Sequence, residues 1–194
     1  MTPTSGTTAI APACDKAGRF DQVSIGLHWL TLALVLAQFA TAWMVDQSGG
    51  AGGNPALWLA IHRSGGVAAW IVVASRLAWR RLFAHLPPFP ASMPRVQQWA
   101  AKANEYGLYA LLLLQPLTGL GDTLFRGRPF VAFGLRVPSL VGPDKPVFHA
   151  LHAAHEAGAV ALVALIGLHA AAALLHGLVL RDGVFGRMLP WTAR

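Results

Sequence analysis

Residues 148–180, FHALHAAHEAGAVALVALIGLHAAAALLHGLVL, decide the fold of this chain. The stretch is longer than the ~20 apolar residues that a helix needs to cross a bilayer. It also contains five histidines, which are His149, His152, His155, His169 and His176. Imidazole inside a membrane is unfavourable unless it is hydrogen-bonded, paired or ligated. We therefore expect some of these histidines to have partners elsewhere in the chain.

The spacing of His155 and His169 distinguishes them from the other three. They are 14 residues apart, and at about 100° per residue the second side chain points within roughly 40° of the first. At 1.5 Å per residue it lies about 21 Å further along the helix. The stretch thus predicts two imidazoles on one helix face at two depths in the membrane, as a protein holding two stacked cofactors would need.

The composition indicates an integral membrane protein. Hydrophobic residues make up 55% of the 194 residues and charged residues 12%, which is unlike a soluble domain. The net charge is +7, and in a membrane protein a basic excess reflects loop orientation and contact with anionic lipid. No nucleic-acid-binding motif is present, so we expect membrane lipid and no nucleic acid as a partner.

Three further apolar runs precede the histidine-rich one, at residues 23–45, 57–79 and 99–124. Each is near the length of a membrane-spanning helix, and a helix satisfies all its backbone groups internally. Pro116 lies inside the third run and should kink that helix or end its regular part. We predict an all-α integral membrane protein, a four-helix bundle.

The chain reads as one domain with two tails. Residues 1–18 are rich in Thr, Ala, Pro and Gly and are interpreted as a disordered tail. Residues 19–190 form the four-span domain, in which residues 125–147 are the longest loop. Residues 191–194 are a short C-terminal tail.

The positions of the basic residues predict the orientation. If both termini are cytoplasmic, ten of the 15 Lys and Arg lie on that side, as the positive-inside rule requires. These ten are Lys16, Arg19, Arg76, Arg80, Arg81, Arg95, Lys102, Arg181, Arg187 and Arg194. The other five are Arg63, Arg126, Arg128, Arg136 and Lys145.

The same orientation pairs the histidines by depth. The first span begins inside and the second outside, and their only histidines, His28 and His62, each lie about one and a half turns in. In the fourth span His155 is near the outer surface and His169 is deeper. Depth therefore pairs His28 with His169 near the inner face. It pairs His62 with His155 near the outer face.

Two neutral imidazoles on opposite sides of a plane are suited to be the axial ligands of a haem iron. Zinc would need four ligands or an open position, and neither level offers a further Cys, Asp or Glu. With both axial positions filled, such an iron would transfer electrons rather than bind oxygen. The sequence thus predicts His28, His62, His155 and His169 as ligands of two haem groups.

Arg76 is a further candidate. It follows His62 by 14 residues, which places it on nearly the same helix face at the depth of the inner site. A buried arginine there could bind haem propionates or a quinone carbonyl. His149, His152 and His176 are interpreted as interfacial, and His85 as a solvated loop residue.

Several segments, in this order, resemble the bacterial cytochrome b561 family of di-haem membrane cytochromes. They are SIGLHWL around His28, HRSGG from His62, LYALLLLQPLTG in the third span, GRPFVAFGL in the outer loop, HEAGA at His155 and GLHAAAALLHG around His169. Together they span most of residues 19–190. The resemblance implies two haem b groups, with the family's ligands at the same four histidines. It also implies the bacterial inner membrane.

The resemblance extends in particular to the branch that includes superoxide:ubiquinone oxidoreductase. It implies electron transfer from superoxide at the periplasmic side to ubiquinone in the membrane. The chain departs from the family at one position. Many members have a histidine four residues before Tyr109, where this chain has Glu105.

The sequence is compatible with three functions. The first is a free-standing oxidoreductase, whose outer loop carries Arg126, Arg128, Arg136 and Lys145 and would attract a small anion. The second is a haem-carrying membrane subunit that links a separate dehydrogenase to the quinone pool, which co-purification of a partner would reveal. The third is a channel or transporter that uses the histidines as a proton or metal path, which an absorbance spectrum would test.

Overall fold

The computed structural model describes residues 18–49 and 53–190. Residues 1–17 and 191–194, which include almost all of the predicted N-terminal tail and the whole predicted C-terminal tail, lie outside the described residues.

Within the described residues four helices are long and apolar enough to cross a membrane. They are α1 (Gln22–Gln47), α2 (Pro55–Leu82), α3 (Arg95–Phe125) and α4 (Lys145–Leu174), and α4 continues into the π-helical segment η2 (Leu175–Leu180). The predicted class, a helical membrane bundle, is confirmed. Each helix begins one to four residues before its apolar run.

Three of these helices begin at a side-chain cap. The carboxylate or amide oxygen of Asp21, Asn54 or Asp144 accepts a hydrogen bond from the backbone N–H three residues later. These contacts satisfy N–H groups that no helical carbonyl can reach. A proline in the first turn of α2 and of α4 also marks the start of the helix. Proline has no backbone N–H, and the N–H groups of the first turn have no helical carbonyl to bond.

Pro116 does not end the third helix. The helix α3 runs from Arg95 to Phe125 with Pro116 inside it, so the alternative that Pro116 would end the regular part is wrong. In a membrane, neighbouring helices and polar side chains can satisfy the backbone groups that a proline leaves free.

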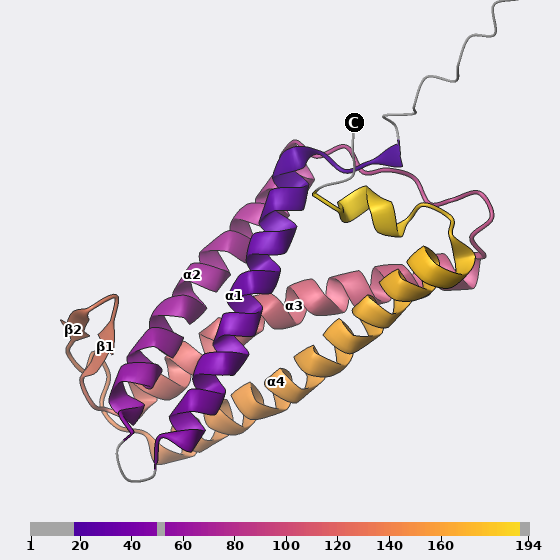
Figure 1. The fold of residues 1–194 in the computed structure, drawn as a ribbon. Helices are drawn as coiled ribbons and strands as arrows, with labels where there is room; N and C mark the ends of the chain where they lie inside the picture. Colours follow the sequence, from indigo (N-terminus) through magenta and orange to yellow (C-terminus); the bar gives the residue numbers. More distant parts are fainter. Residues whose placement is uncertain (1–17, 50–52, 191–194) are drawn as a thin grey trace, which may run out of the picture.

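The helices form two antiparallel pairs, α1 with α2 and α3 with α4, and α2 also packs on α3. The two pairs are inclined to each other, and a small β-hairpin projects from one end of the bundle (Figure 1). We call this the hairpin end. The starts of α2 and α4 lie there, whereas the start of α1 and the end of α4 lie at the opposite end (Figure 1).

The hairpin lies in the segment that the sequence indicated only as a long loop. Strands β1 (Phe130–Ala132) and β2 (Leu135–Val137) pair antiparallel. Phe133 and Gly134, between them, both have positive φ, as tight hairpin turns require. The Phe133 N–H donates to Ser64 Oγ at 2.7 Å, and the Arg63 guanidinium lies over the Phe130 ring at 5.5 Å. These contacts fix the hairpin against α2.

At the opposite end, the C-terminal segment returns to the start of α1. The short helix η3 (Phe185–Met188) lies between the two helix pairs (Figure 1). The indole of Trp29 donates to the Met188 carbonyl at 2.8 Å. This hydrogen bond holds the C-terminal segment next to the first turns of α1.

Candidate haem-binding sites

The structure brings His28 of α1 and His169 of α4 together. Their ring centroids are 6.2 Å apart and the ring planes are tilted by 58°. His28 lies six residues into α1 and His169 lies near the end of α4. This pair therefore belongs to the end of the bundle opposite the hairpin.

His62 of α2 and His155 of α4 form a second pair. Their ring centroids are 6.3 Å apart at an interplanar angle of 87°. The helix α4 thus contributes one imidazole to each pair, and the two pairs lie at different levels along it. The backbone of α4 is not packed closely along either α1 or α2, so the rings meet across the space between the helix pairs.

The ring spacing fits two axial ligands of one iron. A metal–imidazole bond is about 2.0 Å and the ring centroid lies roughly 1.1 Å behind the ligating nitrogen, so opposed ligands place the centroids about 6 Å apart. Both pairs have this spacing. Rings joined by a direct N–H···N hydrogen bond would have centroids only about 5 Å apart. Within the described residues the donor set is two imidazoles without a carboxylate or thiolate, which suits a haem better than zinc.

His62 and His155, which we call the hairpin-end pair, have rings that are held by hydrogen bonds. Nδ1 of His62 lies 3.2 Å from the Gln38 carbonyl and 3.1 Å from Thr41 Oγ1. Nδ1 of His155 lies 3.0 Å from the Gln115 carbonyl and 3.1 Å from Thr118 Oγ1. Gly119 flanks the second ring, because a Cβ there would lie 2.9 Å from His155 Cε1. The packing leaves little freedom for either imidazole.

The other pair lacks such partners within the described residues. Nδ1 of His28 is buried without a hydrogen bond, and no hydrogen bond holds the His169 ring. Arg76 lies close enough to both rings for its charge to act on them. Its guanidinium lies over the Tyr109 ring at 5.5 Å. Among the described residues Arg76 makes no ion pair, so its charge is available to an anionic group.

Comparisons with known proteins give the family. The family model described as prokaryotic cytochrome b561 matches residues 19–191. The chain belongs to this family. It is 30% identical over 173 residues to a protein of Yersinia pestis named as a probable superoxide oxidase, which covers 89% of this chain and 96% of that protein.

Two relatives from Escherichia coli K12 are named cytochrome b561 homolog 1 and homolog 2. Each is 28% identical to this chain, and the matches cover 89% and 88% of it and 97% and 91% of the relatives. The chain is therefore a membrane protein of a prokaryotic electron-transfer family whose members carry b-type haem.

The remaining histidines of this cytochrome lie away from the two facing pairs. His152 is stacked on Phe148, with Asp122 and Glu156 each 3.4 Å away. His176 is buried, and its two ring nitrogens contact Asp182 at 2.6 Å and Gln97 at 3.2 Å. Burial alone would raise the pKa of Asp182, but hydrogen bonds from His176 and the Val184 N–H lower it below its ordinary value. His176 thus serves as a contact between η2 and α3.

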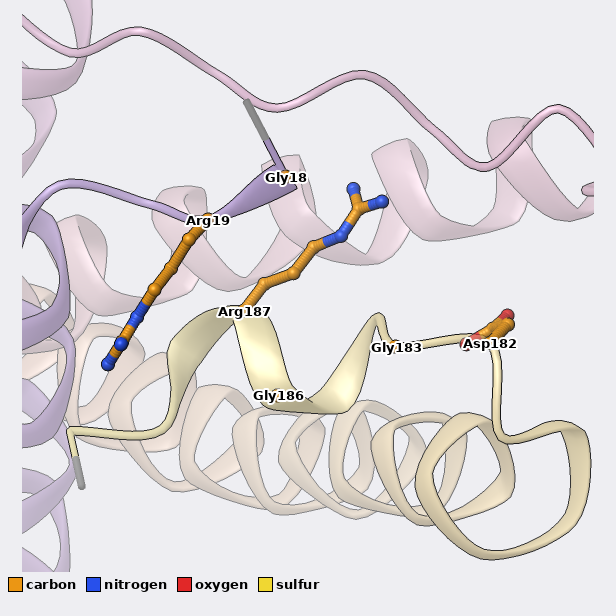
Figure 2. Close-up of a pocket in the computed structure, with 6 residues that line it drawn as sticks. All are labelled: Gly18, Arg19, Asp182, Gly183, Gly186 and Arg187. Atoms are coloured by element: carbon orange, nitrogen blue, oxygen red, sulfur yellow. The ribbon is translucent and has the colours of Figure 1, made fainter. Parts of the chain in front are cut away.

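One surface pocket lies beside η3 at the end opposite the hairpin. It is lined by Gly18, Arg19, Asp182, Gly183, Gly186 and Arg187, and the Arg19 and Arg187 side chains point in different directions (Figure 2). Arg187 donates to the Pro88 carbonyl at 2.6 Å. These arginines therefore support the backbone of the cytochrome and do not converge on one point.

Sequence reasoning missed the polar residues that hold the hairpin-end rings. The first and third spans each contain a glutamine followed three residues later by a threonine, as QFAT at residues 38–41 and QPLT at residues 115–118. The first segment contacts α2 and the second contacts α4. Each of these helices carries a histidine followed three residues later by glycine, which are His62 and Gly65 on α2 and His155 and Gly158 on α4. Comparison of these four-residue segments would have revealed the repetition.

Proposed function

We propose that His28 and His169 are the axial ligands of one haem b, and that His62 and His155 are those of a second. The single observation that carries this proposal is the presence of two facing imidazole pairs at two levels of one bundle, each spaced as opposed ligands of one metal. A haem iron with two axial imidazoles carries single electrons. The chain would thus provide a path for electrons across most of the bilayer.

We further propose that the cytochrome oxidises two superoxide ions to two molecules of dioxygen and delivers the two electrons to ubiquinone, which takes up two protons and becomes ubiquinol. Its relationship at 30% identity to a protein named as a probable superoxide oxidase supports this choice. The hairpin end would face the periplasm and both termini the cytoplasm, because this orientation places most Lys and Arg inside.

The hairpin end is suited to attract superoxide. Arg126, Arg128, Arg136 and Lys145 are all exposed there. Arg126 lies between Asp122 at 3.5 Å and the Phe148 ring at 4.9 Å, so its position is fixed beside α4. Exposed cations raise the local concentration of a small anion and its rate of arrival.

Ubiquinone is apolar and would arrive laterally through the lipid. Arg76 is a cation of α2 whose charge reaches both His28 and His169. In this proposal its guanidinium binds haem propionates or a quinone carbonyl, both of which accept its hydrogen bonds. Arg80 is instead paired with Glu105 at 2.6 Å, the residue found where many family members have histidine.

The alternative is a haem-carrying subunit that receives electrons from a separate dehydrogenase. The deciding experiment uses the purified protein in detergent with ubiquinone. A reduced-minus-oxidised spectrum and a haem-to-protein ratio establish the haem content. Superoxide from an enzymatic generator should then reduce the haem and form ubiquinol. Failure of superoxide to reduce the haem, together with ready reduction by a co-purified dehydrogenase, would establish the subunit function instead.

A further inference from the structure

The two helix pairs hold their hairpin-end histidines in the same way. In each pair the preceding helix contributes a backbone carbonyl and a threonine hydroxyl to one histidine of the following helix. On α1 these are the Gln38 carbonyl and Thr41, which contact His62 of α2. On α3 they are the Gln115 carbonyl and Thr118, which contact His155 of α4.

These partners determine the tautomer of His62. A carbonyl oxygen can only accept, so the proton must reside on Nδ1. The Thr41 hydroxyl donates its own proton to the carbonyls of Ala37 and Gln38 at 2.9 and 3.0 Å, which leaves its oxygen free to accept. The His62 Nδ1–H is therefore shared between two acceptors, and the Nε2 lone pair remains available.

His155 has the same arrangement. The Thr118 hydroxyl donates to the Gln115 carbonyl at 2.9 Å, and the His155 Nδ1–H is shared between that carbonyl and the hydroxyl oxygen. Nε2 of His155 is therefore also the free nitrogen. Both rings of this pair present the same atom as a metal ligand.

The glutamine side chains fix the register of these contacts. The Gln115 amide donates to the His155 backbone carbonyl at 2.9 Å. With its amide oriented to match its partners, Gln38 donates to the His62 carbonyl at 2.9 Å and accepts from the Gly66 N–H at 3.2 Å. Gly65 and Gly158 leave the space for these amides, because a Cβ at either position would collide with the glutamine.

The pair at the opposite end differs. Among the described residues, the buried Nδ1 of His28 has no hydrogen-bonding partner and the His169 ring has no acceptor. Arg76 places a positive charge near both rings. A hydrogen bond from the distal ring nitrogen makes an imidazole a more basic ligand. A more basic ligand favours the oxidised, more positive iron, whereas a nearby cation favours the reduced one.

We propose that Thr41 and Thr118 are positioning residues that give the His62/His155 site the lower reduction potential of the two. The inference rests on the proposed assignment of the four histidines as haem ligands. Electrons that enter at the hairpin end would then move to the His28/His169 site without an energetic obstacle. The threonines act through the histidines and do not contact the electron donor.

The test is a potentiometric titration of the purified holoprotein with Thr41→Val or Thr118→Val. Valine keeps the shape of threonine and removes one of the two acceptors. The haem component that is lost in His62→Ala identifies the hairpin-end site. Its potential should rise, with a change of about threefold to tenfold in the reduction equilibrium, which is about 28 to 59 mV at 59 mV per tenfold for one electron. The other component should not move.

Two further variants separate hydrogen bonding from packing. Thr41→Ser keeps the hydroxyl and should restore the wild-type potential. Thr31→Val removes a buried hydroxyl of the same helix that donates to the Leu27 carbonyl at 2.6 Å, and it should leave both potentials unchanged. If Thr41→Val lost the hairpin-end haem while Thr41→Ser and Thr31→Val retained it, this result would also support a positioning role for the Thr41 hydroxyl.

The inference is overturned if Thr41→Val and Thr118→Val keep both haems at their wild-type potentials, or if Thr41→Ser shifts the potential as far as Thr41→Val. It is also overturned if the hairpin-end component proves to be the higher-potential one in the wild type. Failure of the proposed function would give a different result, because His62→Ala and His155→Ala would then retain the full haem content.

Discussion

The imidazoles of His28 and His169 face each other with ring centroids 6.2 Å apart and planes tilted by 58°. These residues come from the first and last membrane helices, so the tertiary fold creates the pair. The same spacing recurs between His62 and His155. Two such pairs in one bundle lead to a specific expectation for substitutions of the four histidines.

Substitutions of the histidines should fall into two groups. His28→Ala and His169→Ala should disturb one haem component, and His62→Ala and His155→Ala the other, because each pair shares one iron in the proposed assignment. Haem-to-protein ratios and potentiometric titrations measure this. His152→Ala is the matched control, since its ring contacts Asp122 and Glu156 and lies in neither pair. Common behaviour of His28→Ala and His62→Ala would contradict the pairing.

Arg76→Leu should lower the reduction potential of the His28/His169 haem and weaken quinone reduction. As a general scale, a charge about 10 Å from a redox centre is worth about 1–2 kcal/mol at an effective dielectric constant of about 20, and a loss of this order is expected for the reduced state. Arg76→Lys should restore most of the potential, and the exposed Arg81 of the same helix provides a control in Arg81→Leu. An unchanged potential and normal quinone turnover would show that Arg76 has only a structural role.

Superoxide-driven reduction should depend on the exposed cations at the hairpin end. Replacing Arg126, Arg128, Arg136 and Lys145 together by Gln should slow haem reduction by about tenfold at low ionic strength. It should also flatten the dependence on salt, which acts over a Debye length of about 10 Å at 0.1 M. Stopped-flow absorbance measures both effects.

The control for this experiment replaces three exposed arginines at the other end of the bundle. Arg81, Arg95 and Arg181 are also exposed there, and their replacement by Gln should leave the rate with superoxide unchanged. Equal effects of both sets of substitutions would indicate a response to net charge alone and would rule out steering at the hairpin end.

Asp21 should make stability depend on acid pH. Burial tends to raise its pKa, but hydrogen bonds from Ser24 and from the Trp79 indole at 3.0 Å lower it below its ordinary value. Its contribution is therefore complete above the unfolded pKa of about 3.9 and is lost as pH falls through the lower folded value. The difference in stability between wild type and Asp21→Asn should shrink over that range, because asparagine can cap but cannot titrate.

Thermal unfolding in detergent measures this difference. Asp21→Ala removes the cap itself and should cost about 1 kcal/mol at neutral pH. Asp46→Asn, at the exposed other end of α1, is the control and should follow the wild type. A difference that stays constant down to pH 2 would show that the Asp21 charge does not contribute.

The sequence predicted the helices well because their signals are local. Apolar length identifies each span, and Asp21, Asn54 and Asp144 mark three of the starts by capping. The sequence was less informative where the local pattern is compatible with two structures. Pro116 could have ended α3, yet the helix continues through it, and residues 130–137 could have remained an irregular loop, yet they form a hairpin.

By itself the sequence determined the membrane helices and the position of each histidine along its helix, because hydropathy and the rise per residue of a helix are local properties. The tertiary structure decided what surrounds each ring. The contacts of Thr41 with His62 and of Thr118 with His155 join different helices, and they depend on how deeply one helix packs into the next. Helix register and rotation arise from packing over the whole interface, so no single residue predicts which histidine gains a hydrogen-bonding partner and which is left without one.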